Sequence, residues 1–209
     1  MLIGHSNIKK RDVVIDIGAG SGVITSALAR RCRVVIAVEP DKETAVKLRA
    51  NLERQGIEVQ RYESEAFSEN FTTDNTKCSG NEKTGGGIIG EGGRTGKKLA
   101  EVYVAEEDFL TMKLPECQYK VFANPPFHLS SKIVHRLIEA ENQPESFYLI
   151  LQKQFALKLL LTDRHYTSQL GKQLVQKYQT KIKYPLKPTD FTPPPAVPTV
   201  LFEAKSIAI

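Results

Sequence analysis

The chain has 209 residues, enough for one α/β domain with a sizeable buried core but too few for two full domains. Its composition, 41% hydrophobic and 25% charged, is that of an ordinary globular protein, and no apolar run is long enough to span a bilayer or to form a secretory signal. The three cysteines are widely separated, which predicts neither a disulfide framework nor a zinc site, and the net charge of +5 favours a polyanionic partner only weakly. We therefore expect residues 1–209 to form a single, monomeric, cytoplasmic domain with no metal ion and no membrane contact.

The first part of the chain alternates strands and helices. The apolar run Val13–Ile17 predicts a strand, the glycine turn Gly18–Gly22 follows it, and a helix is expected over Val23–Arg31. Val34–Val38 predicts the second strand, and Asp41 begins a helix that Gly56 ends. By the handedness rule for such crossovers, the two strands should be parallel neighbours.

Two segments compete for the third strand, Ile57–Tyr62 and Val102–Ala105, and we prefer the second. Between them, residues 64–98 are rich in Gly, Ser, Thr, Asn and Lys, with the glycine runs Gly85–Gly87 and Gly90–Gly93. Such a composition buries too little apolar surface to order itself. The sequence therefore predicts a flexible inserted loop over residues 64–98.

In the second part of the chain, Tyr119–Ala123 predicts a strand that leads directly into Asn124-Pro-Pro-Phe127. A helix with an apolar stripe of Ile133, Val134, Leu137 and Ile138 follows, and we expect this stripe to be core. The remaining elements, in chain order, are a strand over 146–151, a helix over 153–161, a helix-to-strand or strand segment over 170–183, a stiff proline-rich loop over 185–198 and a last strand over 199–204. This alternation indicates an α/β fold with a doubly wound, mostly parallel sheet and a ligand site at the carboxyl ends of its strands.

Two features at these strand ends fit an adenosine-containing cofactor. The turn Gly18–Gly22 lets a ligand approach the backbone, which would suit a nucleotide, a dinucleotide or S-adenosylmethionine. Glu39 ends the second strand, where a carboxylate can accept hydrogen bonds from both hydroxyls of a ribose. The alternative interpretation of Glu39 is a solvated carboxylate in front of Pro40.

The end of the preferred third strand supplies a third feature. Asp108 could accept a hydrogen bond from the exocyclic amine of the cofactor's adenine, and Phe109 could pack on the ring. Asp108 could instead be an acidic loop residue beside Glu106 and Glu107. Together with the glycine turn and Glu39, the first interpretation predicts a site for a complete adenosine.

The segment Asn124–Phe127 indicates the chemistry. An adenine amine is a weak nucleophile because its lone pair is delocalised into the ring, so an enzyme must supply acceptors for both N–H bonds. The side-chain oxygen of Asn124 and the main-chain carbonyl of Pro125 can do so, while Phe127 stacks on the extruded base. Positioning would then carry catalysis without a general base, and His128 is interpreted as an ordinary loop residue. The plain alternative is a strand-ending turn.

In four stretches the sequence resembles the rRNA adenine N6-dimethyltransferase family, which includes the erythromycin-resistance methylases and the small-subunit rRNA dimethylases. These stretches are Asp16–Thr25, Asp108–Phe127, Leu149–Leu161 and Asp190–Val197. The resemblance implies a Rossmann-like methyltransferase fold, S-adenosylmethionine as cofactor, ribosomal RNA as partner, and one or two methyl groups added to an adenosine N6. The short interval between Asp108 and Asn124 resembles the resistance branch and favours large-subunit rRNA, with antibiotic resistance as a possible outcome.

The resemblance also implies the site residues. Those for the cofactor are Asp16, Gly18, Gly20, Glu39, Asp108, Phe109 and Asn124; those for catalysis are Asn124, Pro125 and Phe127; those of the target-base loop are Phe191, Pro193 and Pro194. Three features depart from the family pattern. Relatives usually have Leu or Ile in place of Pro125, a segment with a Gln-Asn-Phe-like motif before the first strand, and a helical RNA-binding domain after the last one.

Two other functions fit parts of the pattern. Asn-Pro-Pro-aromatic motifs also serve methyltransferases that act on DNA adenine or on a protein glutamine amide, although the Phe191–Pro195 loop argues against both. The third hypothesis is a non-catalytic RNA-binding or ribosome-assembly factor on the same fold, which the departures at both ends of the chain favour.

Overall fold

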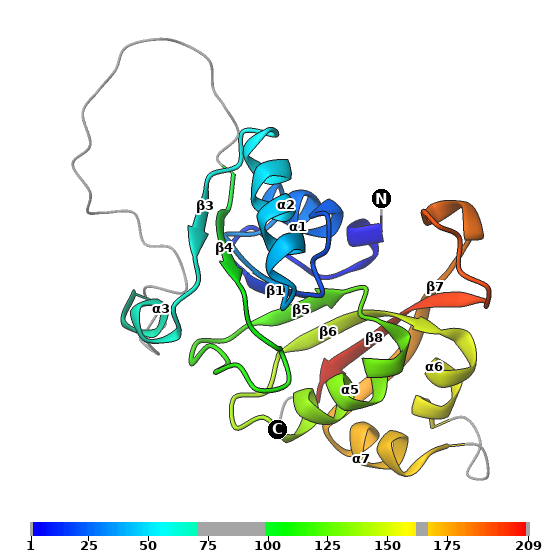
Figure 1. The fold of residues 1–209 in the computed structure, drawn as a ribbon. Coiled ribbons are helices and arrows are strands. Elements are labelled where there is room, and N and C mark those ends of the chain that lie inside the picture. Colours follow the sequence, from blue (N-terminus) through cyan, green and yellow to red (C-terminus); the bar gives the residue numbers. More distant parts are fainter. Residues whose placement is uncertain (1, 71–98, 162–166, 208–209) are drawn as a thin grey trace, which may run out of the picture.

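A single twisted sheet organises the molecule. The computed structural model describes residues 2–70, 99–161 and 167–207, with the side chains of 68–70 left aside. Within these ranges, eight strands lie in the order β3-β4-β2-β1-β5-β6-β8-β7 (Figure 1). The strands are β1 (Val13–Ile17), β2 (Val34–Val38), β3 (Val59–Arg61), β4 (Glu101–Ala105), β5 (Lys120–Ala123), β6 (Ser146–Gln152), β7 (Tyr178–Leu186) and β8 (Thr199–Ser206). Strands β1 to β6 are all parallel to one another, and β8 is antiparallel to both of its neighbours, β6 and β7. The predicted mostly parallel sheet is therefore confirmed.

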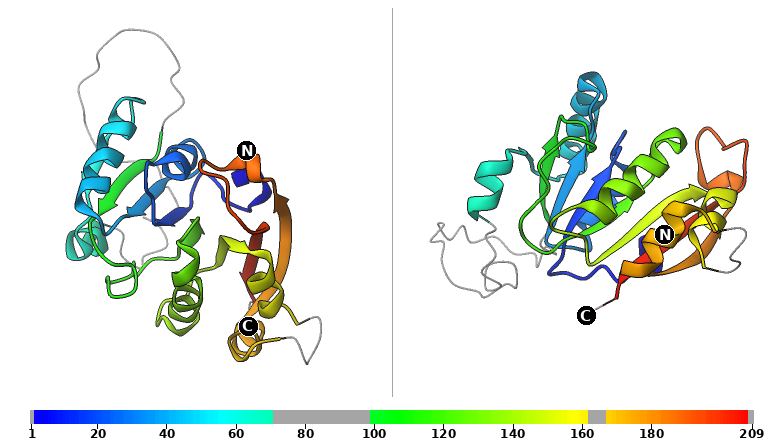
Figure 2. Two further views of the ribbon diagram at one scale, coloured as in Figure 1. Left: turned by 45° about the vertical axis from the view of Figure 1, so that its right-hand side comes forward. Right: turned by 90° about the horizontal axis from the view of Figure 1, so that it is seen from below.

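Helices cover both faces of the sheet (Figure 2). One apolar core lies between the sheet and helices α1 (Val23–Ala29) and α2 (Lys42–Glu53). The other core includes α5 (Ser130–Glu139), α6 (Lys153–Leu159) and α7 (Gln169–Lys177). Every residue of β1 and β2 is buried, as expected for parallel strands that are covered on both sides. The doubly wound architecture is therefore confirmed.

The first crossover depends on glycine at one position. Gly22, at the start of α1, has φ of 86°, which disfavours any side chain. A Cβ atom there would also lie 2.7 Å from Leu48 Cδ1 on α2, too close for a real contact. Next along the chain, Asp41 caps α2 by accepting a hydrogen bond of 2.8 Å from the Thr44 amide. Local sequence signals thus fix where both helices begin.

The choice between two third strands was wrong in one respect, because both segments contain a strand. The preferred segment forms β4 and pairs with β2 over Val34 to Val38, as expected for the third strand. The rejected segment supplies β3, which adds to β4 at the edge of the sheet. Only three residues long and partly exposed, β3 lacks the buried apolar run by which a strand is recognised in a sequence.

The predicted insertion also needs correction at its start. Residues Ser64–Asn70 form helix α3, not a loop. Its Phe67 is buried, with ring centroids 5.3 Å from Tyr62 and 5.2 Å from Tyr103. One aromatic side chain against two others supplies the apolar burial that the composition of the segment lacks. The rest of the predicted insertion, residues 71–98, lies outside the described residues.

The last part of the chain returns to the site through an antiparallel pair. The unassigned segment over 170–183 is a helix followed by a strand, α7 and then β7. Pro185 lies within β7, which it can do because β7 is an edge strand. A short 3₁₀ helix, Pro188–Asp190, follows, and the proline-rich loop then leads into β8. Because Thr199 pairs with Gln152, this loop lies beside the carboxyl end of β6.

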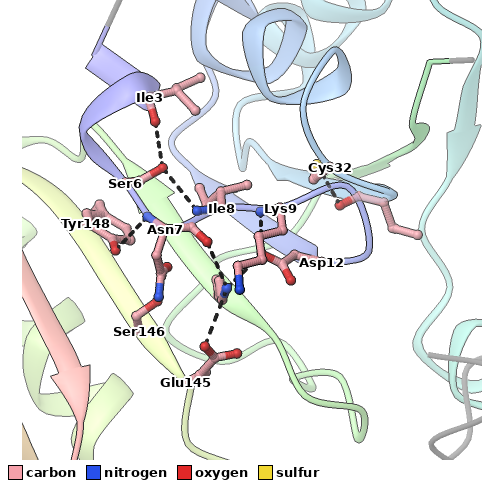
Figure 3. A network of polar contacts seen from close by, with 12 residues as sticks. Ile3, Ser6, Asn7, Ile8, Lys9, Asp12, Cys32, Glu145, Ser146 and Tyr148 are labelled. Atoms are coloured by element: carbon pink, nitrogen blue, oxygen red, sulfur yellow. Dashed lines mark hydrogen bonds and ion pairs between the residues drawn. The ribbon is translucent and has the colours of Figure 1, made fainter. Parts of the chain in front are cut away.

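A buried lysine holds the N-terminal segment against the sheet, at the end where the parallel strands begin. Lys120 begins β5, and its ammonium group lies 2.7 Å from an Asp12 carboxylate oxygen and 3.4 Å from a Glu145 oxygen. It also donates to the Asn7 carbonyl oxygen at 3.2 Å. Asn7 also contacts Tyr148 and Ser146 on β6 (Figure 3). Asn7, Asp12 and Glu145 thus all contact the Lys120 ammonium group.

Candidate functional site

A cavity of about 460 Å³ opens at the carboxyl edge of the sheet, where the sequence predicts a ligand site. Its walls come from the ends of β1, β2 and β5, the segment after β4, the start of α5 and the proline-rich loop. The lining residues are Ile17, Gly18, Val38, Glu39, Pro40, Asp108, Phe109, Leu110, Asn124, Pro125, Pro126, Phe127, Leu129, Ile133, Phe191, Pro193, Pro194 and Pro195. Ten of the twelve residues singled out in the sequence are in this set; Asp16 and Gly20 are not.

The glycine turn and the Asn124–Phe127 segment are neighbours in the wall of this cavity. Gly18 has φ of 70°, and its amide donates to the Val38 carbonyl oxygen at 2.9 Å, which holds the turn against β2. A Cβ atom on Gly18 would lie 3.6 Å from Pro126 Cδ and 3.9 Å from Pro125 Cα. The absence of a side chain therefore leaves the space between the two motifs open.

Glu39 links the turn to the rim of the cavity. Its side chain is largely buried, and its Oε2 atom accepts a hydrogen bond of 2.9 Å from the Gly20 amide. The other oxygen, Oε1, accepts from the Asp41 amide at 3.2 Å. Gly20 thus contributes to the site indirectly, by orienting Glu39. Since a carboxylate offers about four acceptor positions, two remain for a ligand hydroxyl pair.

Asp108 and Phe109, from the segment after β4, also line the cavity. Asp108 is exposed, and its Oδ1 atom accepts a hydrogen bond of 2.9 Å from the Leu110 amide, which leaves Oδ2 free of protein donors among the described residues. Phe109 is 3% exposed and belongs to the core, so only a small part of the ring reaches the cavity. The packing role predicted for Phe109 is therefore limited to that accessible part.

The Asn124–Phe127 segment places polar and aromatic groups side by side. Asn124 is exposed to the cavity, Pro125 is buried, and Phe127 is half-buried at the first position of a 3₁₀ helix, Phe127–Leu129, that runs into α5. No protein partner takes up the Asn124 amide among the described residues, so it can bind a ligand. From the other side, Phe191 and the prolines of the loop complete the cavity.

Asp16 is completely buried next to the site. Its Oδ2 atom accepts a hydrogen bond of 2.7 Å from Thr25 Oγ1, whereas Oδ1 has no partner among the described residues. Burial raises the pKa of this carboxyl group from 3.8 to about 7, and although the Thr25 hydrogen bonds oppose the shift, the charge of Glu39 adds to it. A carboxyl group next to the glycine turn thus has its pKa raised towards neutral pH by burial.

We predict that Asp16→Asn stabilises the folded protein above pH 7. The pKa of Asp16 is raised on folding, so stability from its protonation is fully present below pH 3.8 and is lost as the pH rises through about 7. An amide does not titrate, and the gain at pH 8 should be roughly 2 kcal/mol, about half of the full value of the shift, because burying an amide also has a cost. Thermal unfolding at pH 5 and pH 8 measures this, and an equal difference between the two proteins at both pH values would contradict it.

Sequence reasoning missed several residues of the cavity. Ile133 was assigned to the core, yet it lines the cavity as well as being buried. Leu129 precedes it by one helical turn, so the start of the apolar stripe of α5 could have indicated both. Pro126 and Pro195 belong to the motifs already noted. Leu110 lines the cavity because its amide donates to Asp108 in a turn, and no sequence pattern indicated this contact.

The described ranges give no support for a metal site or for a membrane-spanning helix. They hold no group of three or more His, Cys, Asp or Glu side chains that could bind a metal ion. None of their helices has the length and apolar character needed to cross a membrane. Cys32 and Cys117 are buried and form no disulfide among the described residues, while Cys78 lies outside them.

Comparisons with known proteins agree with the geometry. The sequence profile of the ribosomal RNA adenine dimethylase family matches residues 2–208. A probable ribosomal RNA small subunit methyltransferase A from Methanococcus aeolicus is 26% identical over 95% of this chain and 57% of its own length.

Solved structures share the fold. A dimethyladenosine transferase from Plasmodium falciparum has a TM-score of 0.69 at 19% identity, covering 98% of this chain and 59% of that one. The 23S rRNA methyltransferase ErmE has the same TM-score at 20% identity, covering 99% of this chain and 66% of that one. The chain thus spans less than two thirds of the length of each of these proteins.

Proposed function

Because the chain belongs to the ribosomal RNA adenine dimethylase family, we propose that it transfers methyl groups from S-adenosylmethionine to the N6 amine of an adenosine in ribosomal RNA. The observation that carries this proposal is the single cavity shared by Gly18, Glu39, Asp108 and Asn124. Groups suited to an adenosine cofactor and groups suited to an adenine amine face one space there. Residues 1–209 would act as one catalytic domain in this reaction.

The described residues fit S-adenosylmethionine. The side-chain-free surface at Gly18 gives the methionine part access to the backbone, and Glu39 has acceptor capacity left for the ribose hydroxyls. The free Oδ2 atom of Asp108 suits the adenine amine. Asp16 lies next to the turn, where the ionised form of its carboxyl group would favour the positively charged cofactor. When bound, the cofactor supplies the electrophilic methyl group.

Target-base binding would fall to the other half of the cavity. The Asn124 side-chain oxygen and the Pro125 carbonyl would accept both N–H bonds of the amine, which directs its lone pair towards the methyl group. Phe127 supplies a flat face for stacking on the extruded adenine, and Phe191 adds a second aromatic ring to the same cavity.

We predict that Glu39→Ala weakens S-adenosylmethionine binding at least tenfold, about 1.4 kcal/mol, because the ribose loses its acceptor. Isothermal titration calorimetry gives the dissociation constant, with Glu43→Ala, an exposed carboxylate on α2, as the control. Unchanged affinity in Glu39→Ala would refute the ribose assignment. Thermal unfolding should accompany the titration, because Glu39 also holds the Gly20 and Asp41 amides.

The RNA subunit that carries the target is the finer part of the proposal. The short interval between Asp108 and Asn124 favours large-subunit rRNA, whereas the name of the Methanococcus aeolicus relative points to the small subunit. We therefore design the test so that each subunit's rRNA is a separate substrate.

The decisive experiment incubates the protein and methyl-labelled S-adenosylmethionine with protein-free small-subunit or large-subunit rRNA, followed by nucleoside analysis. The proposal expects N6-methyladenosine or N6,N6-dimethyladenosine in one of the two. Parallel incubations contain DNA or a glutamine-containing protein in place of rRNA, and label on either of these would support the alternative substrate class. Cofactor binding without transfer to either rRNA would favour a non-catalytic RNA-binding factor.

A further inference from the structure

A second hollow lies on the same edge of the sheet, beside the candidate site. It has a volume of about 410 Å³ and lies where β6 ends and α6 begins. Its lining residues are Gln152, Lys153, Gln154, Leu157, Val197 and Pro198. The Lys153 amide donates to the Pro198 carbonyl oxygen at 2.8 Å, and Gln152 pairs with Thr199 across β6 and β8. The two walls of this hollow are therefore held together by backbone contacts.

The side chains of the hollow suit a nucleotide. Each of the amides of Gln152 and Gln154 offers a donor and an acceptor, the combination that reads the edge of a base, and Lys153 offers a charge for a phosphate. Leu157 and Val197 add apolar surface, and Val197 is 39% exposed. None of the lining residues is acidic, and within the described chain no hydrogen bond engages the three polar side chains.

The proline-rich loop joins the hollow to the candidate site. Phe191 and Pro193 to Pro195 line the first cavity, whereas Val197 and Pro198 line the second. The strands beneath are also neighbours, because β5 ends at Ala123, just before Asn124, and pairs with β6, which ends at the hollow. A single-stranded RNA with one base in the first cavity would pass over this loop.

We propose that the hollow binds the nucleotide adjacent to the target adenosine. In this assignment, which rests on the proposed function, Gln154 and Gln152 read the base, Leu157 and Val197 pack against it, and Lys153 contacts its phosphate. The hollow thereby makes target choice depend on the neighbouring base as well as on the adenine itself.

The test uses a fluorescein-labelled oligouridylate with one central adenosine, and matched forms in which the 5′ or the 3′ neighbour of that adenosine lacks its base. Fluorescence anisotropy measures the affinity of the whole chain in the presence of S-adenosylhomocysteine. Removing one of these two bases should weaken binding to the wild type roughly tenfold, because a bidentate amide contact with a base edge is worth about 1–3 kcal/mol. Gln154→Ala should bind the intact RNA more weakly than the wild type does, and its affinities for the intact and the abasic form should differ by less than those of the wild type.

The control is Gln173→Ala, an equally exposed glutamine on α7 that does not line the hollow, and it should behave as the wild type. Equal affinity of the wild type for all forms, or a full preference in Gln154→Ala, overturns the inference. Methyl transfer to rRNA separates it from the proposed function. If the wild type transfers methyl groups but binds intact and abasic RNA equally, only the assignment of the hollow is wrong. If it shows a Gln154-dependent preference for intact RNA but transfers no methyl group, only the methylation proposal is wrong.

Discussion

Replacing Asn124 by alanine is expected to lower kcat for rRNA methylation by roughly a hundredfold to a thousandfold, the range found when one preorganised hydrogen-bonding group of an active site is removed. The amine of the target adenine would keep the Pro125 carbonyl but lose its second acceptor, so its lone pair would no longer point at the methyl group. Cofactor binding should survive largely intact, because Gly18, Glu39 and Asp108 are unchanged. Single-turnover methylation with labelled cofactor, together with calorimetry, measures both quantities.

The neighbouring residues supply the controls for this experiment. Phe127→Ala should lose a stacking contribution of about 1–3 kcal/mol, whereas Phe127→Tyr should keep much of the activity because any flat aromatic face can stack. His128→Ala should resemble the wild type, since His128 is exposed and does not line the cavity. Equal rates for the wild type and Asn124→Ala would mean that the segment is only a strand-ending turn.

Lys120→Met is expected to destabilise the fold by about 3–5 kcal/mol, a large part of the stability of a typical domain. The Lys120 side chain is 4% exposed and that of Asp12 is 9% exposed, so the substitution leaves a buried carboxylate without its cation. The Asn7 carbonyl loses a donor at the same time. Denaturant unfolding measures the loss, and a change below about 1 kcal/mol, as for a surface pair, would contradict the prediction.

Two further variants test the cause. In Asp12→Leu/Lys120→Met both charges are absent, and replacing a buried pair by apolar groups should recover most of the stability. Lys113→Met removes a pair with Glu116 whose side chains are 55% and 51% exposed, and should cost less than about 1 kcal/mol. A double variant as unstable as Lys120→Met would show that packing, not charge, is responsible.

Features that depend on residues close together in the chain could be predicted from local patterns. The alternation of apolar runs and glycine turns predicted the order of strands and helices around Val13–Val38, because parallel buried strands and positive-φ glycines leave local signals. The motif Asn124–Phe127 could be recognised in the same way, because its amide, carbonyl and aromatic groups are adjacent in the chain. Its position at the carboxyl edge followed from the doubly wound topology.

Features that join distant segments of the chain could not be predicted in this way. Strand β3 is too short and too exposed to be recognised, and it forms because β4 offers a free edge for pairing. Helix α3 depends on the contacts of Phe67 with Tyr62 and Tyr103, which composition does not reveal. The pairing of Lys120 with Asp12 likewise joins positions far apart in the chain.

The same distinction applies to the two cavities. A glutamine at the end of a strand or at the start of the next helix, such as Gln152 or Gln154, looks like an ordinary surface residue until the loop from β7 to β8 brings Val197 beside it. Periodicity reports the burial of one element, whereas a cavity needs the relative placement of several elements. Antiparallel pairing of β6 with β8 provides that placement here, and it depends on long-range hydrogen bonds that no local pattern of residues encodes.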